Sequence, residues 1–251
     1  MKRLVLFDID GTLIRGGVFW RECFEGAVST CFPGLSVSKV TFSGKTDGLI
    51  CREVLQQAGF PEDTHARHTE SIMSEYLRRA EAGITHRGRE IVVLPGVHEL
   101  LARLAEDSRI HLALLTGNVR AGARLKLETS GLWQWFPWGV FADDHWIRNQ
   151  LSPLALARAR ECIGMEFAGE EVVVIGDTVH DVNCGRAIGA RVIAVGTGKT
   201  VDQEALRCSA PDHYFEDFRD TSAVIAAILQ SVERVEAEDG VSGKGNGKRT
   251  P

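Results

Sequence analysis

Short apolar runs alternate with helix-patterned segments over most of the chain after residue 94. The runs are rich in Val, Ile and Leu, and the segments between them carry apolar residues at helical spacing. We expect strands at 3–7, 111–115, 139–141, 171–175, 191–195 and 213–215. Continuous apolar runs are typical of strands that are buried on both faces, because a half-exposed strand would alternate. The pattern predicts an α/β fold with a doubly wound parallel sheet covered by helices on both faces.

A different pattern occupies the chain between the first apolar run and residue 83. Apolar residues recur there at four-residue steps, as in Phe19, Cys23 and Ala27, and no strand-like alternation interrupts them. We interpret this segment as a helical cap domain inserted after the first strand. The expected organisation has three parts: an α/β core at 1–17 and 89–235, a helical cap at 18–88, and a disordered tail at 236–251 that is rich in Gly, Lys, Ser and Asp.

The composition is that of an ordinary soluble globular protein, with 44% apolar and 25% charged residues. A net charge of −5 offers no attraction for nucleic acid or for an anionic membrane surface. No apolar run is long enough for a signal sequence or a membrane span. The six cysteines lie far apart without a C-x-x-C pair, which favours reduced thiols. We therefore expect a cytoplasmic protein without a nucleic-acid or membrane partner, and the sequence leaves the oligomeric state open.

Polar residues follow three of the predicted strands. Asp8 and Asp10 come after the first, Thr116 after the second, and Asp177 after the Val-rich strand, with Asp181 where a helix begins. Because ligands of open α/β sheets bind beyond the carboxyl ends of the strands, these residues are candidates for one site. Several carboxylates at one sheet edge repel each other unless a cation neutralises them. Their oxygen ligands predict a hard divalent ion, above all Mg²⁺.

These residues resemble the motifs of the haloacid dehalogenase-like hydrolase superfamily. The match consists of the run 8–12 (Asp-Ile-Asp-Gly-Thr), Thr116 after an apolar strand, and 176–181 with its two aspartates. The resemblance covers about 3–200 and is strongest to the phosphatase branch with a helical cap, of which phosphoglycolate phosphatase is an example. It implies an α/β hydrolase core and a substrate that is a small phosphorylated metabolite.

The resemblance also implies a mechanism. Asp8 would attack phosphorus and form an aspartyl-phosphate, and Asp10 would protonate the leaving alcohol and then deprotonate water. The metal ligands would be a carboxylate oxygen of Asp8, the backbone carbonyl of Asp10 and the side chain of Asp177. Asp181 would support them directly or through water.

Phosphate binding is expected of Thr116, Gly117, Asn118 and a cation. The family usually carries a lysine before a helix as its third motif, and here Arg148 is the best stand-in. Lys45, in a Gly-Lys-Thr-Asp loop between two cap helices, is a candidate for substrate specificity. Either cation can also be an ordinary surface charge.

Two other functions fit the same motifs. A sugar phosphomutase of the same superfamily keeps both aspartates of the first motif, and a non-catalytic regulatory protein would accept phosphate on Asp8 without turnover. A dehalogenase would need neither Asp10 nor magnesium, so the intact aspartate pair argues against it. The run 196–200 (Gly-Thr-Gly-Lys-Thr) imitates the end of a phosphate-binding loop, but Ile193 stands where that motif requires its first glycine.

Overall fold

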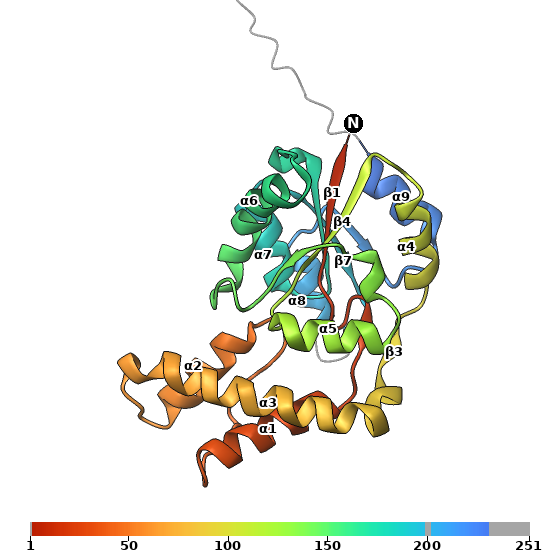
Figure 1. The fold of residues 1–251 in the computed structure, drawn as a ribbon. Helices are drawn as coiled ribbons and strands as arrows, with labels where there is room; N and C mark the ends of the chain where they lie inside the picture. Colours follow the sequence, from red (N-terminus) through yellow and green to blue (C-terminus); the bar gives the residue numbers. More distant parts are fainter. Residues whose placement is uncertain (1, 199–201, 231–251) are drawn as a thin grey trace, which may run out of the picture.

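A six-stranded sheet forms the centre of the computed structural model, which describes residues 2–198 and 202–230. All neighbouring strands are parallel, in the order β5-β4-β1-β6-β7-β8 (Figure 1). The strands are β1 (Arg3–Phe7), β4 (Ile110–Leu115), β5 (Gly139–Val140), β6 (Val172–Gly176), β7 (Arg191–Val195) and β8 (His213–Phe215). The prediction of a doubly wound parallel α/β sheet is confirmed. The tail expected at 236–251 lies outside the described residues.

Helices cover both faces of the sheet (Figure 1). One face carries α4 (Val97–Ala105), α5 (Arg120–Thr129) and α9 (Thr221–Leu229); the other carries α6 (Leu151–Ile163) and α7 (Val179–Ala187), with α8 (Gln203–Cys208) beside α7. The central strand β1 packs against both helix layers. Val5 and Phe7 lie on the α4 side, and Leu4 and Leu6 lie on the α6 side. This double burial explains why the strand appears in the sequence as a continuous apolar run.

A bundle of three helices lies beyond the carboxyl end of the sheet (Figure 1). It consists of α1 (Phe19–Cys31), α2 (Asp47–Gln57) and α3 (His65–Arg87), whose apolar faces share one buried cluster. The chain enters and leaves the bundle through a two-stranded antiparallel ribbon, β2 (Ile14–Arg15) with β3 (Val92–Val93). The sequence pattern does not predict this ribbon, because two residues are too few for a periodicity. The cap boundaries at 18 and 88 stay a prediction, although they fall just inside the ribbon.

The short 3₁₀ turns of the described residues lie in the connections: Glu62–Thr64, Gly88–Glu90, Trp133–Trp135, Arg148–Gln150 and Gly169–Glu171. No helix in the described part of the chain is both long and apolar enough to cross a bilayer. None of the six cysteines is in a disulfide bond.

The strand order brings the predicted polar residues to one place. In the sheet β4, β1 and β6 are adjacent, and Phe7 is in register with Leu114 on one side and Ile175 on the other. The residues that follow these strands therefore emerge side by side, under the cap.

Candidate active site

The turn after β1 fixes the first two aspartates. It is closed by backbone hydrogen bonds from Leu13 and Ile14 to the carbonyl of Ile9, and Gly11 adopts a left-handed conformation with φ 88°. A Cβ atom at Gly11 would lie 2.2 Å from a carboxylate oxygen of Asp177. Glycine is therefore required here both for the turn and for the close approach of Asp177 to the residues after β1.

Three carboxylates gather at the strand ends. Oxygen atoms of Asp8, Asp177 and Asp181 all lie within 4.8 Å of one another, and all three residues are buried. Burial raises the pKa of Asp8 to about 7, with Arg148 opposing this shift and neighbouring carboxylates adding to it. Burial and the charges of Asp181 and Asp8 also raise the pKa of Asp177 well above its ordinary value. The raised pKa values show that the negative charges of these carboxylates are not fully neutralised by their surroundings.

Arg148 supplies part of the neutralising positive charge. It begins a 3₁₀ turn before α6, is only 6% exposed, and one guanidinium nitrogen, Nη2, contacts Oδ1 of Asp8 at 2.9 Å and Oδ1 of Asp181. Burial alone would lower its pKa, but the carboxylates of Asp181 and Asp8 hold the pKa of Arg148 well above its usual value. The sequence-predicted cation therefore lies between two of the sequence-predicted carboxylates.

Asp181 also takes part in the N-terminal cap of α7. Thr178 is the N-cap of α7, and its hydroxyl accepts a hydrogen bond from the backbone N–H of Asp181. In return Oδ2 of Asp181 accepts from the backbone N–H of Thr178 at 3.0 Å and from its hydroxyl at 2.6 Å. This reciprocal cap fixes the carboxylate, whose other oxygen meets Arg148. By contrast, among the described residues the side chain of Asp177 receives one long contact, from the hydroxyl of Thr12 at 3.4 Å.

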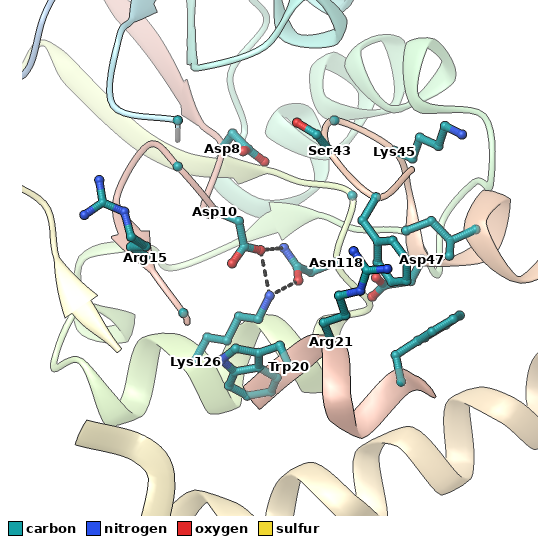
Figure 2. Close-up of a pocket in the computed structure, with 18 of the residues that line it drawn as sticks. Asp8, Asp10, Arg15, Trp20, Arg21, Ser43, Lys45, Asp47, Asn118 and Lys126 are labelled. Carbon is teal, nitrogen blue, oxygen red and sulfur yellow. Dashed lines mark hydrogen bonds and ion pairs between the residues drawn. The ribbon is translucent and has the colours of Figure 1, made fainter. Parts of the chain in front are cut away.

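The residues after β4 form a small polar network with Asp10 (Figure 2). Asn118 donates from Nδ2 to Oγ1 of Thr116 at 2.8 Å and to Oδ2 of Asp10 at 2.9 Å. Lys126 on α5 donates to the same oxygen of Asp10 and to Oδ1 of Asn118, both at 2.6 Å. The sequence reasoning missed Lys126. A signal was present, since this lysine follows Gly122 and Ala123, small residues of the buried face of the helix, by one helical turn.

The cap loop between α1 and α2 rests on the loops of the core. The backbone N–H of Asp47 donates to the carbonyl of Gly117 at 2.7 Å, and the carboxylate of Asp47 accepts from the N–H of Val119 at 2.8 Å. Burial raises the pKa of Asp47 to about 6, with Lys126 opposing. Asp47 is a second residue of the site that the sequence reasoning did not select. Lys45 lies in this loop too, and its amine is bound by Glu53 at 2.6 Å.

A substitution at Gly117 should separate the two loops. A Cβ atom there would lie 2.3 Å from the carbonyl oxygen of Lys45 and 2.8 Å from Nη1 of Arg148. We expect Gly117→Ala to lower kcat/KM by about 10- to 100-fold while the fold persists, because the cap loop and the arginine must both shift. Steady-state kinetics and circular dichroism measure the two effects. The matched control is Gly122→Ala, where a Cβ atom has ordinary contacts of 3.5 Å or more; equal losses in both variants would contradict the explanation.

A cavity of about 550 Å³ lies between the cap and the strand ends. Its core wall includes Asp8, Asp10, Gly117, Asn118, Lys126, Arg148 and Asp177. Its cap wall is largely apolar, with the aromatic residues Trp20, Phe24, Phe42 and Tyr76 and the aliphatic Ile50, and it also carries the cations Arg21 and Lys45. The cavity therefore has mostly charged and polar side chains on its core side and mainly apolar side chains, with two cations, on its cap side. Two other predicted site residues, Thr116 and Asp181, do not line the cavity. Both are almost completely buried behind the residues that do.

The fold and the site define a capped α/β protein with a cluster of buried aspartates at the strand ends. The chain belongs to the haloacid dehalogenase-like hydrolase family, whose model matches residues 5–195. The chain is 28% identical over 193 residues to pyrophosphatase PpaX of Halalkalibacterium halodurans, covering 76% of this chain and 82% of that protein. It is 24% identical over 248 residues to phosphoglycolate phosphatase 1 of Pseudomonas aeruginosa, covering 96% and 85%.

A solved structure of a hydrolase from Pseudomonas syringae has the same fold. It superposes with a TM-score of 0.68 at 21% identity, covering 92% of this chain and all of that one. The family match identifies the chain as a haloacid dehalogenase-like hydrolase, as its motifs suggested, and both sequence relatives named above are phosphatases.

Proposed function

We propose that this enzyme is a Mg²⁺-dependent phosphatase that hydrolyses a small phosphate monoester through an aspartyl-phosphate on Asp8. The observation that supports it most strongly is the position of Asp8 on the cavity floor, between Arg148 and Asp177 and two residues before Asp10. This arrangement combines a nucleophile, a cation and an acid/base group around a single space that is large enough for a phosphate ester.

The donor set suits a hard divalent cation. In the described part of the chain, Asp177 is a buried carboxylate with one weak partner, and three carboxylates with one arginine leave an excess of negative charge there. We assign the ion to a carboxylate oxygen of Asp8, the backbone carbonyl of Asp10 and the side chain of Asp177, with Asp181 supporting from its capped position. When bound, Mg²⁺ would cancel charge between the phosphate and the nucleophile.

In the first half of the reaction a carboxylate oxygen of Asp8 forms a bond to phosphorus, and the bond from phosphorus to the leaving oxygen breaks. Asp10 gives its proton to that oxygen, so the alcohol leaves neutral. Arg148, Thr116 and the amides of Gly117 and Asn118 bind the phosphoryl oxygens, where charge spreads in the transition state.

In the second half a water molecule attacks the phosphorus of the aspartyl-phosphate, and Asp10 takes the proton from this water. The bond between phosphorus and the oxygen of Asp8 breaks, phosphate leaves, and both carboxyl groups return to their starting states. Asp47 ties the cap loop to the core beside this space, where the cap would help to exclude other water molecules once substrate is bound.

The shape of the cavity favours an ester with a substantial organic group. The aromatic cap wall offers apolar contact area, which an organic substituent can cover and inorganic pyrophosphate cannot. Lys45 would contribute to specificity only by exchanging its partner Glu53 for the substrate. The family and its relatives suggest phosphoglycolate and sugar phosphates as candidates, and of these the sugar phosphates have the larger organic group that the cavity favours.

Chelation tests the metal-based mechanism. We expect phosphate release from a panel of monoesters to fall at least about 10²-fold in EDTA and to return with added Mg²⁺, because the carboxylate cluster then repels the substrate. Mg²⁺ should also raise the melting temperature of wild-type protein but not of Asp177→Asn. Undiminished turnover in EDTA would refute the metal assignment.

The same panel separates the alternatives. A phosphomutase would convert one sugar phosphate into its isomer without releasing phosphate, and a regulatory phospho-acceptor would label Asp8 once and stop. We expect repeated turnover with phosphate release, because the cavity holds Asp10 beside the nucleophile, where it can activate water. A phosphomutase keeps the same two aspartates, so the appearance of an isomerised sugar phosphate is the result that would favour it.

A further inference from the structure

Lys126 is a buried cation that the mechanism above does not use. Its residue is 4% exposed, and its ammonium group lies 4.9 Å from the centre of the Trp20 ring on cap helix α1. Burying an ammonium group is costly unless strong partners surround it. The partners here are a carboxylate, an amide oxygen and an aromatic face, so the amine is held in one position.

Lys126 and Asn118 both donate a hydrogen bond to the same oxygen atom of Asp10. Oδ2 accepts from Nζ of Lys126 at 2.6 Å and from Nδ2 of Asn118 at 2.9 Å. The bond from Lys126 to Oδ1 of Asn118 closes the triangle and fixes the orientation of the amide, since its oxygen must face the ammonium group (Figure 2). Among the described residues, no other side chain bonds to the carboxylate of Asp10, whose side chain is 44% exposed in the cavity.

We propose that Lys126 is a positioning residue, which together with Asn118 reserves Oδ2 of Asp10 as an acceptor and presents Oδ1 as the oxygen that exchanges the proton. An oxygen that receives two donors cannot also carry a proton without losing one of them. The free oxygen, Oδ1, is therefore the one that faces the leaving group. This inference depends on the proposed function, because it needs Asp10 as the acid.

The fixed orientation of Asp10 matters in the step in which the ester bond breaks. As the bond from phosphorus to the leaving oxygen lengthens, the proton passes from Oδ1 of Asp10 to that oxygen, and the charge left on Asp10 is shared by Lys126. A carboxyl group that rotates freely in a half-open cavity would offer its proton in the right direction only part of the time. Leaving groups of high basicity need this proton most, whereas a nitrophenolate ion leaves without it.

Aryl phosphates of different leaving-group basicity test the proposal, since they share one shape. We compare kcat/KM of wild type and Lys126→Met for phenyl phosphate and para-nitrophenyl phosphate, because kcat/KM reports steps up to loss of the phenol. Lys126→Met should lose about 10²-fold on phenyl phosphate and less than about fivefold on the nitrophenyl ester. If this variant does not fold, Lys126→Gln takes its place. A merely structural lysine would lower both values by the same factor.

Two controls keep the outcomes apart. Inhibition by inorganic phosphate should stay unchanged in Lys126→Met, and Lys2→Met, which removes another lysine that lies over an aromatic ring, should leave the ratio of the two substrates as in wild type. Asp10→Asn reports on the proposed function. If Asp10→Asn loses the same factor in kcat/KM on both aryl phosphates, the acid role of Asp10 and this inference both fail. If Asp10→Asn loses more on phenyl phosphate and Lys126→Met loses the same factor on both, only the role of Lys126 is overturned.

Discussion

Replacement of Asp8 by asparagine is expected to lower kcat by at least about 10⁴-fold, because an amide oxygen cannot form the aspartyl-phosphate. The geometry leaves no substitute, since Asp181 is fixed by its cap contacts with Thr178 and Asp10 is bound by Asn118 and Lys126. Phosphate release under single-turnover conditions measures the loss. Asp107→Asn, a surface aspartate paired with Arg109, is the control. A rate for Asp8→Asn within tenfold of wild type would exclude the nucleophile assignment.

The same variant should be more stable than wild type when metal is absent. The pKa of Asp8 is raised to about 7 in the folded protein, from an ordinary value of 3.8. The folded state therefore holds a proton that the unfolded state has already lost between about pH 4 and pH 7, and stability falls as the pH rises through this range. Asparagine lacks this cost. The melting temperature of Asp8→Asn in EDTA should exceed that of wild type at pH 8, and the difference should shrink towards pH 5; a difference independent of pH would contradict this account.

The core of the fold could be predicted because its strands are buried on both sides. Leu4 to Phe7 contribute alternately to two apolar layers, so the sequence shows an unbroken run that only a central parallel strand explains well. The ribbon of Ile14–Arg15 with Val92–Val93 could not be predicted, because its pairing joins residues almost 80 positions apart through backbone bonds that leave no side-chain pattern.

The site was predictable where the side chains follow directly from a strand. Asp8, Thr116 and Asp177 come next to adjacent strands, and the sheet brings them together whatever the loops do. Their catalytic roles stay predictions. Lys126 and Asp47 could not be selected in the same way, because each reaches the site through tertiary packing: the lysine across α5, the aspartate across the contact between cap and core. Local sequence carries little trace of such contacts.

Arg148→Met is expected to lower kcat/KM by about 10³-fold, since it removes the cation that faces both the nucleophile and the developing charge on phosphate. Its side chain is buried, and its Nη2 atom alone makes the bonds to Asp8 and Asp181. Loss of this atom leaves two buried carboxylates that repel each other more strongly. The methionine variant should therefore also become less stable as the pH rises, which thermal melting in EDTA at several pH values would measure.

Arg148→Lys keeps a positive charge at this position and tests whether the shape of the guanidinium group is also needed. A single nitrogen atom of Arg148 bridges the two carboxylates, and its buried Nε atom has no hydrogen-bond partner among the described residues. The bridge therefore does not depend on the planar fork of the guanidinium group. An ammonium group can make both bonds, so the lysine variant should keep its stability. It loses Nη1, which lies beside Gly117 where phosphate is expected, and we predict a decrease in kcat/KM of about tenfold. If lysine proves as damaging as methionine, the fork itself is required, and Arg148 binds phosphate through a geometry that an ammonium group cannot reproduce.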